Sequence, residues 1–411
     1  MNFPFYISKR IVKNEARSFS RLIVVIARIA IALSLAVMIV SSCMVNGFRK
    51  TISEKIYGFW GHINIAKESL RSSYDDLPIS MNKDFINAIL QTEGVESVQV
   101  YARKAGVIKT KSDIEGIIAK GISSDFNWQH FDKYIIEGRR MVFNDSTSSR
   151  DILLSRSTAD RMQLKTGDST VLYFIDPAQN GDYTPRAREL IVAGIYNTGL
   201  EEFDKLFALV DIRHIQRLNN WNKDQVGGYE IFVHDVEHIS EIAEQVDVTA
   251  DPFWEVQTVQ QILPSIFDWL NLQKINERII LILMFTVALI NMITSLLILI
   301  LERTNMIGIL KAVGAGNSSI QKIFLFHAAY IISWGMFWGN VVGLTLCFLQ
   351  QQFGLLKLPE QSYYVTVAPV AIDFLWILLL NAGTLLISLL FLIIPSKLVS
   401  RIQPVKAIRF N

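Results

Sequence analysis

The sequence predicts an α-helical membrane protein with four transmembrane helices and a large α+β domain inserted between the first and second helices. Three observations lead to this fold class. Hydrophobic residues make up 51% of the chain and charged residues only 19%, which is too apolar for an ordinary soluble protein. Four apolar runs are long enough to cross a bilayer, which takes roughly 20 residues. A stretch of mixed polarity, long enough for two small domains, separates the first run from the second.

The four runs divide the chain into consecutive segments. Amphipathic or helix-like sequence adjoins the first two runs, since NGFRKTISEKIYGF follows the first and a helical pattern from Val259 leads into the second. The expected segments are an N-terminal amphipathic segment at 1–21, transmembrane helices at 22–48, 273–301, 323–349 and 374–394, an outer domain at 49–272, a coupling segment at 302–322, an outer loop at 350–373 and a tail at 395–411.

Basic residues indicate the orientation. The N-terminal segment carries five lysines and arginines against one acid, and the tail carries four against none. Because cytoplasmic loops are enriched in lysine and arginine, both termini and the coupling segment are expected in the cytoplasm, and residues 49–272 on the outer side. An alternative for the first run is a lipoprotein signal ending at VSSC (Val40–Cys43). The run continues past Cys43, which favours a membrane helix.

The outer domain has a mixed α/β pattern. HINIA and VESVQVY are strand-like around the helical MNKDFINAILQ, and YEIFVHD and FWEVQT flank the helical VEHISEIAEQV. Two such β-α-β units predict a split, ferredoxin-like sheet. STVLYFI, RELIVAGIY and FALV lie between them. They predict a smaller β-rich subdomain inserted at about 131–225. Within it, Asp176–Arg186 contains two prolines and an Asn-Gly pair, so it is either a protruding hairpin tip or an ordinary surface loop.

Motifs of catalysis are weak. HDVEH (His234–His238) matches the H-x-x-E-H zinc pattern, but His234 closes a strand and Asp235 is placed as a helix N-cap. The two imidazoles are therefore expected to diverge. The sequence contains no G-x-x-x-x-G-K-[ST] phosphate loop, and no serine sits in a nucleophile elbow. The chain is not expected to be an enzyme, and ATP hydrolysis is expected in a partner.

Two features of the membrane segments predict helix contacts. Gly335, Gly339 and Gly343 recur at a spacing of four residues, which lets a second helix approach closely. Arg28 near the cytoplasmic end of the first helix is interpreted as structural. In the coupling segment, ERTNMIGILKAVGA places Met306, Ile307, Leu310 and Val313 on one helix face. Such a helix lies on lipid or fits a groove of a soluble partner, and its low lysine content favours the partner.

Several stretches resemble one family, the permeases of lipoprotein-releasing (Lol) ABC transporters. They are MVNGFRKTISEKIYGFWGHINI after the first helix, ERTNMIGILKAVGAGNSSIQKIFL in the coupling segment, LPEQSYYVTVAPVAID in the last outer loop and IPSKLVSRIQPVKAIRF in the tail. The coupling and tail motifs are shared with the wider class of MacB-like exporters and FtsX-like division permeases. A mechanotransmission permease that regulates an envelope hydrolase and an efflux permease therefore stay open as alternatives.

The resemblance implies a function and a set of partners. The chain would extract lipoproteins from the inner membrane of a Gram-negative bacterium and release them toward a periplasmic carrier. Its partners would be two copies of a cytoplasmic ATPase that uses ATP and Mg, a second identical or homologous permease, the lipoprotein cargo and the carrier. No cofactor, metal or nucleic acid is expected on this chain.

The resemblance also implies three sets of functional residues. The ATPase would contact the coupling segment through Glu302, Arg303, Met306, Ile307, Leu310, Lys311 and Gly314. Cargo would pass between the first two helices along Met44, Val45, Phe48, Ile262, Ile266 and Phe267. The carrier would be hooked by Asp176, Pro177, Tyr183, Pro185 and Arg186.

Overall fold

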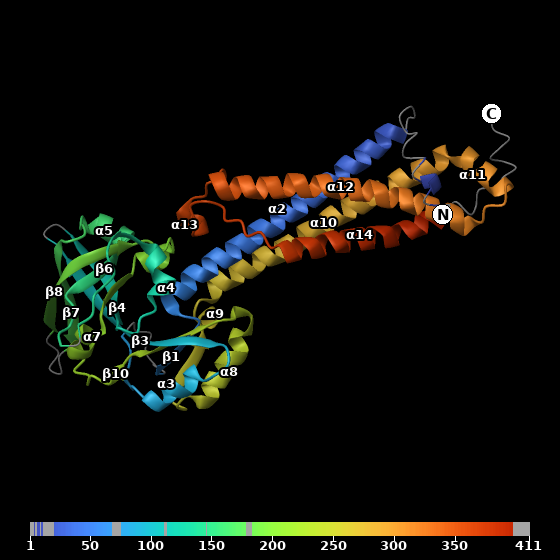
Figure 1. The fold of residues 1–411 in the computed structure, drawn as a ribbon. Coiled ribbons are helices and arrows are strands. Elements are labelled where there is room, and N and C mark those ends of the chain that lie inside the picture. Colours follow the sequence, from blue (N-terminus) through green and yellow to red (C-terminus); the bar gives the residue numbers. More distant parts are fainter. Residues whose placement is uncertain are drawn as a thin grey trace. The chain divides into compact units, whose positions relative to one another are not determined.

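The computed structural model describes residues 20–67, 75–110, 113–144, 146–177 and 183–397, with residues 4, 6–8 and 10. The expected segment 1–21 and tail 395–411 lie almost wholly outside these residues. The chain divides into two compact units (Figure 1). We call them the membrane unit, with residues Met1–Arg49, Trp269–Lys357 and Val367–Asn411, and the globular domain, with residues Lys50–Asp268 and Leu358–Thr366.

Four helices are long and apolar enough to cross a membrane, as predicted: α2 (Ser20–Trp60), α10 (Pro264–Glu302), α12 (Asn317–Phe353) and α14 (Phe374–Ser396). Three of them continue well beyond their apolar runs. Helix α2 includes NGFRKTISEKIYGF as an uninterrupted extension, so this stretch is helical. Helix α10 follows the short helix α9 (Val259–Ile262), whose start is fixed by a capping box between Thr258 and Gln261.

Inside the membrane unit, the glycines of α12 pack against α2. A Cβ on Gly335 would lie 2.8 Å from Ile31 Cβ, and a Cβ on Gly339 would lie 2.9 Å from the carbonyl oxygen of Ala32. Both distances are too short for any larger residue, so the predicted close approach is confirmed. Helices α12 and α14 are joined by a reciprocal amide pair, in which the Asn340 and Asn381 side chains donate to each other over 2.7 and 3.0 Å. Polar pairs of this kind hold helices together in lipid.

The globular domain is built on one large sheet with the strand order β12-β1-β11-β3-β4-β9-β6-β8-β5. Its first four strands pair antiparallel in the ferredoxin-like order that the two β-α-β units predict. Helices α3 (Lys83–Leu90) and α8 (Ile239–Thr249) are the expected helices of these units. The four strands are β1 (Ile63–Lys67), β3 (Val95–Lys109), β11 (Gly228–Val233) and β12 (Trp254–Thr258).

The β-rich insert shares this sheet. Strand β3 pairs with β11 through Val95–Tyr101 and with β4 through Tyr101–Lys109. The sheet continues from β3 through the strands β4 (Ile114–Ile122), β5 (Ile135–Gly138), β6 (Asp151–Ser155), β7 (Ser169–Pro177), β8 (Tyr183–Tyr196) and β9 (Phe207–Asp211). Strand β4 lies upstream of the expected start near residue 131 and connects β3 to β9 in the sheet. The second half of β3 was not predicted as a strand, because it contains the charged residues Arg103 and Lys104. In the structure these two side chains form ion pairs with Asp76 and Asp75.

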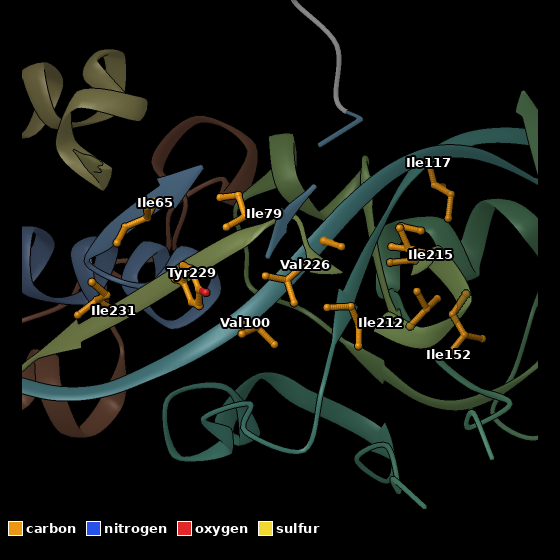
Figure 2. Packing of buried hydrophobic residues seen from close by; sticks show 14 of the residues in the cluster. Ile65, Ile79, Val100, Ile117, Ile152, Ile212, Ile215, Val226, Tyr229 and Ile231 are labelled. Atoms are coloured by element: carbon orange, nitrogen blue, oxygen red, sulfur yellow. The ribbon is translucent and has the colours of Figure 1, made fainter. Parts of the chain in front are cut away.

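Short elements complete the domain. They are β2 (Ile79–Ser80), α4 (Trp128–Phe131), η2 (Asp132–Tyr134), α5 (Arg156–Met162), α6 (Glu201–Asp204), α7 (Ile212–Leu218), β10 (Gln225–Val226), η3 (Val236–His238) and α13 (Glu360–Tyr363). One hydrophobic core runs through both parts of the sheet. Figure 2 shows Ile65, Tyr229 and Ile231 of the ferredoxin-like part and Ile117, Ile152 and Ile215 of the insert. The insert and the first four strands thus form one continuously packed domain.

Candidate functional site

The coupling segment forms helix α11 (Thr304–Ala312) between α10 and α12. Ile307 is fully buried in the hydrophobic cluster of the membrane unit, and Met306 and Leu310 pack against that cluster while half-buried. The face that the sequence assigned to the ATPase is therefore largely occupied by the chain itself. A polar side chain at Ile307 would be buried without a partner, so a substitution there is expected to disturb the fold as well as any partner contact.

An exposed stripe of α11 includes Val313, the helix C-cap, which the sequence placed on the same face as Met306, Ile307 and Leu310. Asn305, Ile309, Ala312 and Val313 are exposed and follow the spacing of one helix face, with Ile309 53% and Val313 83% exposed. Gly314, which follows, has a φ of +97° and open space around it. Glu302 is exposed, whereas Arg303 and Lys311 are half-buried at the edges. The coupling residues thus separate into a buried anchor and an exposed stripe, which we call the α11 outer face.

The motifs after the first helix and in the last outer loop meet inside the membrane unit. A Cβ on Gly47 would lie 2.4 Å from the carbonyl oxygen of Pro369, so only glycine fits there. The Ala371 amide donates to the Cys43 carbonyl over 3.0 Å, and Trp376 Nε1 donates to Ser42 Oγ over 2.7 Å. NGF and TVAPV therefore each contribute residues to a tight junction between α2 and the segment that leads into α14.

The far end of α2 is fixed inside the globular domain by a buried lysine. Lys120 of β4 is 1% exposed and lies 2.7 Å from Glu230 of β11, which is fully buried. Lys120 also donates to the Phe59 carbonyl in the last turn of α2, where the helix dipole favours a cation. Gln99 donates to the second Glu230 oxygen over 2.7 Å. Burial lowers the pKa of Lys120, and the adjacent Glu230 carboxylate opposes this shift.

Other contacts complete this end of the helix. Gly61 N donates to the Tyr57 carbonyl over 2.8 Å, and Asn64 Nδ2 donates to the Trp60 carbonyl over 2.7 Å. The Lys120 ammonium lies 4.7 Å from the ring centre of Phe59, within cation–π range. Three carbonyls at the end of α2 are therefore satisfied by the globular domain. Sequence reasoning missed Lys120, although a lysine inside the apolar strand GIIAKGI was a usable signal.

The residues proposed for the cargo path fall in both units. Met44, Val45 and Phe48 lie on the membrane part of α2 and are half-buried. Ile262 belongs to the globular domain and is also half-buried. In contrast, Ile266 is 4% exposed, and the Phe267 ring stacks on Tyr57 with centroids 6.0 Å apart. These last two side chains are used in packing within the domain.

The stretch Asp176–Arg186 belongs to the β7–β8 hairpin, with Pro177 opposite Tyr183 and Ile175 opposite Pro185. The tip at 178–182 and the side chains from 175 to 185 lie outside the described residues. Arg186 is described, and its guanidinium donates to the Leu218 carbonyl at the end of α7 over 2.8 Å. Arg186 therefore stabilises the hairpin base, and its expected contact with a carrier stays a prediction.

The zinc alternative gains no support. Asp235 caps η3 and accepts from His238 Nδ1 over 2.8 Å, while the His234 amide donates to Gly94. Among the residues that the structure describes, no group of three histidine, cysteine or acidic side chains is placed to hold a metal ion.

The fold and these junctions define a multi-pass membrane protein whose first helix is built into a large α+β domain. Residues 24–264 match the model of the MacB-like periplasmic core domain, and residues 278–404 match that of the FtsX-like permease C-terminal domain. The chain therefore belongs to the MacB-like periplasmic core domain family and ends in an FtsX-like permease domain.

Named relatives match along almost the whole chain. The lipoprotein-releasing system transmembrane protein LolC of Neisseria meningitidis is 24% identical, with 99% of each chain covered. LolE of Haemophilus influenzae is 22% identical, again with 99% of each covered. Among solved structures, the periplasmic region of MacB from Actinobacillus actinomycetemcomitans aligns with a TM-score of 0.34 and 10% identity, covering 51% of this chain and 95% of that one.

Proposed function

We propose that this chain is the permease subunit of an ABC transporter that extracts lipoproteins from the inner membrane and releases them toward a periplasmic carrier. The observation that carries the proposal is the end-to-end similarity to LolC and LolE, each covered over 99% of its length. Similarity that includes both the membrane helices and the inserted domain supports a shared mode of action, in which membrane helices move the domain.

The energy would come from a separate ATPase, two copies per complex, that binds ATP and Mg. The sequence lacks a phosphate loop of its own, and the α11 outer face offers Ile309 and Val313 as exposed apolar side chains. An exposed apolar helix face suits the groove of a soluble partner. In this arrangement both termini and α11 are cytoplasmic, the globular domain is periplasmic and the chain binds no cofactor. A second permease, identical or homologous, completes the assembly.

Cargo would enter along the outer part of α2. Met44, Val45 and Phe48 are half-buried in a single chain, which leaves apolar surface for acyl chains. Burying each CH₂ contributes about 0.8 kcal/mol, so several chains would bind tightly and need ATP-driven movement to leave. Ile262 stays in this proposal, whereas Ile266 and Phe267 are better explained by packing. A photo-crosslinker at Met44 should capture a lipoprotein in an ATP-sensitive manner, and one at the fully buried Leu35 should not.

The FtsX-like match at 278–404 keeps a mechanotransmission permease as a second candidate, and the MacB-like match at 24–264 keeps an efflux permease as a third. Mass spectrometry of the complex purified in detergent separates them. We expect an ATPase and lipid-modified proteins to copurify, with release of those proteins on ATP addition. Copurification of a cell-wall hydrolase without acylated proteins would establish the second candidate. Absence of both the hydrolase and acylated proteins would favour the efflux permease.

A further inference from the structure

The loop between α12 and α14 contributes its tip to the globular domain. The loop closes as a narrow hairpin, in which Lys357 bridges Val367 and the Leu358 amide donates to the Thr366 carbonyl over 2.9 Å. Residues Leu358–Thr366 form one compact unit with Lys50–Asp268, whereas the residues on either side belong to the membrane unit. The chain therefore enters the globular domain a second time through this loop.

Lys55 holds the tip. It lies on the extension of α2 within the globular domain, is half-buried, and donates from Nζ to the Tyr364 carbonyl over 2.8 Å. Tyr364 is the C-cap residue after α13 and has a φ of +60°, a left-handed conformation that is uncommon for tyrosine. Val365 beside it is only 6% exposed. The tip is thus seated by one buried apolar side chain and one charged hydrogen bond.

Gly199 leaves room for this contact. A Cβ on Gly199 would lie 2.5 Å from Lys55 Nζ and 2.5 Å from Glu360 Oε1. The Lys55 ammonium and the Glu360 carboxylate therefore both occupy the space that a side chain at position 199 would need. That backbone is held by Asp204, which accepts from the Gly199 amide over 2.9 Å and from Thr198 Oγ1 over 2.8 Å. Thr198, Gly199 and Asp204 of the insert thus form the surface on which the loop tip packs.

We propose that Lys55 is a positioning residue that keeps the loop tip on the globular domain, so that the loop transmits movement of α12 and α14 to that domain during transport. Helix α12 follows directly after α11, the proposed ATPase contact, and is bound to α14 through Asn340 and Asn381. A displacement of α11 thereby reaches both ends of the loop. This inference rests on the proposed function for its transport readout, and on the contacts of Lys55 alone for its structural readout.

The test compares Lys55→Met with Lys133→Met in the full ATPase–permease complex. Lys133 is a nearby, half-exposed lysine whose ion pair with Glu54 spans 3.6 Å. Hydrogen exchange of residues 358–366 should become about tenfold faster in Lys55→Met, as expected for losing one hydrogen bond to a charged donor. Lipoprotein released per ATP hydrolysed should fall severalfold, with the melting temperature and ATP hydrolysis retained. Lys133→Met should change neither, and Lys55→Arg should restore both.

Two results would overturn the inference. Unchanged exchange in 358–366 would show that Lys55 does not hold the tip. Faster exchange with normal release per ATP would show that the tip is only a cover. A wild-type complex that releases no lipoprotein would instead overturn the proposed function, and the exchange comparison would still stand.

Discussion

Lys120 and Glu230 form an ion pair of 2.7 Å in the middle of the large sheet, with side chains 1% and 0% exposed. The pair lies against the last turn of α2, because Lys120 also donates to the Phe59 carbonyl. A charge this deeply buried is tolerated only with a partner and further hydrogen bonds. Here the two charged residues come from β4 and β11, and the further hydrogen bonds involve Gln99 of β3 and the Phe59 carbonyl, so the pair joins the end of α2 to the domain core.

Removing one partner of the Lys120–Glu230 pair should lower the stability of the protein. Lys120→Met leaves Glu230 buried without its cation, and the free energy of unfolding should fall by about 3–5 kcal/mol. In the double variant Lys120→Met, Glu230→Leu both charges are absent, and most of that loss should be recovered. Denaturant unfolding of the purified chain in detergent measures both. A double variant that is less stable than Lys120→Met would contradict this account.

The α11 outer face should bind the ATPase. Ile309→Asp with Val313→Asp places two charges in the proposed interface and should weaken ATPase binding by about 2 kcal/mol or more, while the permease keeps its melting temperature. Val248→Asp is the matched control, because Val248 is 89% exposed on the globular domain. Copurification and ATP hydrolysis report the result. Normal copurification of the double variant would place the ATPase elsewhere.

The glycine stripe of α12 should not accept side chains. Gly339→Ala brings a methyl group to 2.9 Å from Leu35 Cβ, and overpacking of this kind costs about 1–3 kcal/mol. Gly383→Ala on α14 is the control, since a Cβ there meets no atom within 4 Å. We expect a clear drop in the melting temperature for the first variant and none for the second. Equal melting temperatures would mean that the two helices separate easily.

His62 should make the globular domain sensitive to acid. It is 5% exposed, and its Nδ1 accepts from the Val233 amide over 3.1 Å. Burial, with a smaller effect of His130, lowers the pKa of His62 to about 3. The unfolded chain takes up this proton near pH 6.5, so the stabilisation is complete above that pH and is lost as the pH falls toward 3. At pH 5 the loss is about 2 kcal/mol.

The comparison that isolates this effect uses His62→Asn, which does not titrate. The difference in melting temperature between pH 7 and pH 5 should be smaller in this variant than in the wild type. An unchanged difference would assign the acid sensitivity to other groups.

The β7–β8 hairpin should act on the carrier and not on the ATPase. Replacing residues 177–184 by a short Gly-Ser turn keeps Arg186 and its bond to Leu218, so the hairpin base should stay folded. Transfer of lipoprotein to the carrier should fall by at least tenfold if one hot-spot contact is lost, with ATPase assembly unchanged. Transfer at the wild-type rate would leave the tip as an ordinary loop.

Sequence patterns alone were enough to predict the four membrane helices and the ferredoxin-like half of the domain. Apolar runs of bilayer length and strand–helix–strand alternation are local patterns, and local physics produces them in any context. The glycine spacing on α12 also predicted its contact correctly, because every fourth residue lies on one helix face.

The three-dimensional packing was needed to establish which face of α11 is exposed, because a stripe of Met306, Ile307 and Leu310 fits a partner's groove and the chain's own helix bundle equally well. The partners of Lys120 and Lys55 could not be predicted either, because they are far away in the sequence. Lys120 is neutralised by Glu230, which is 110 positions away in the sequence, and Lys55 is bound to Tyr364, 309 positions away. Burial of a charge depends on partners that folding brings together. Neighbouring residues can therefore mark Lys120 as unusual in an apolar strand, but they cannot identify the partner of either lysine.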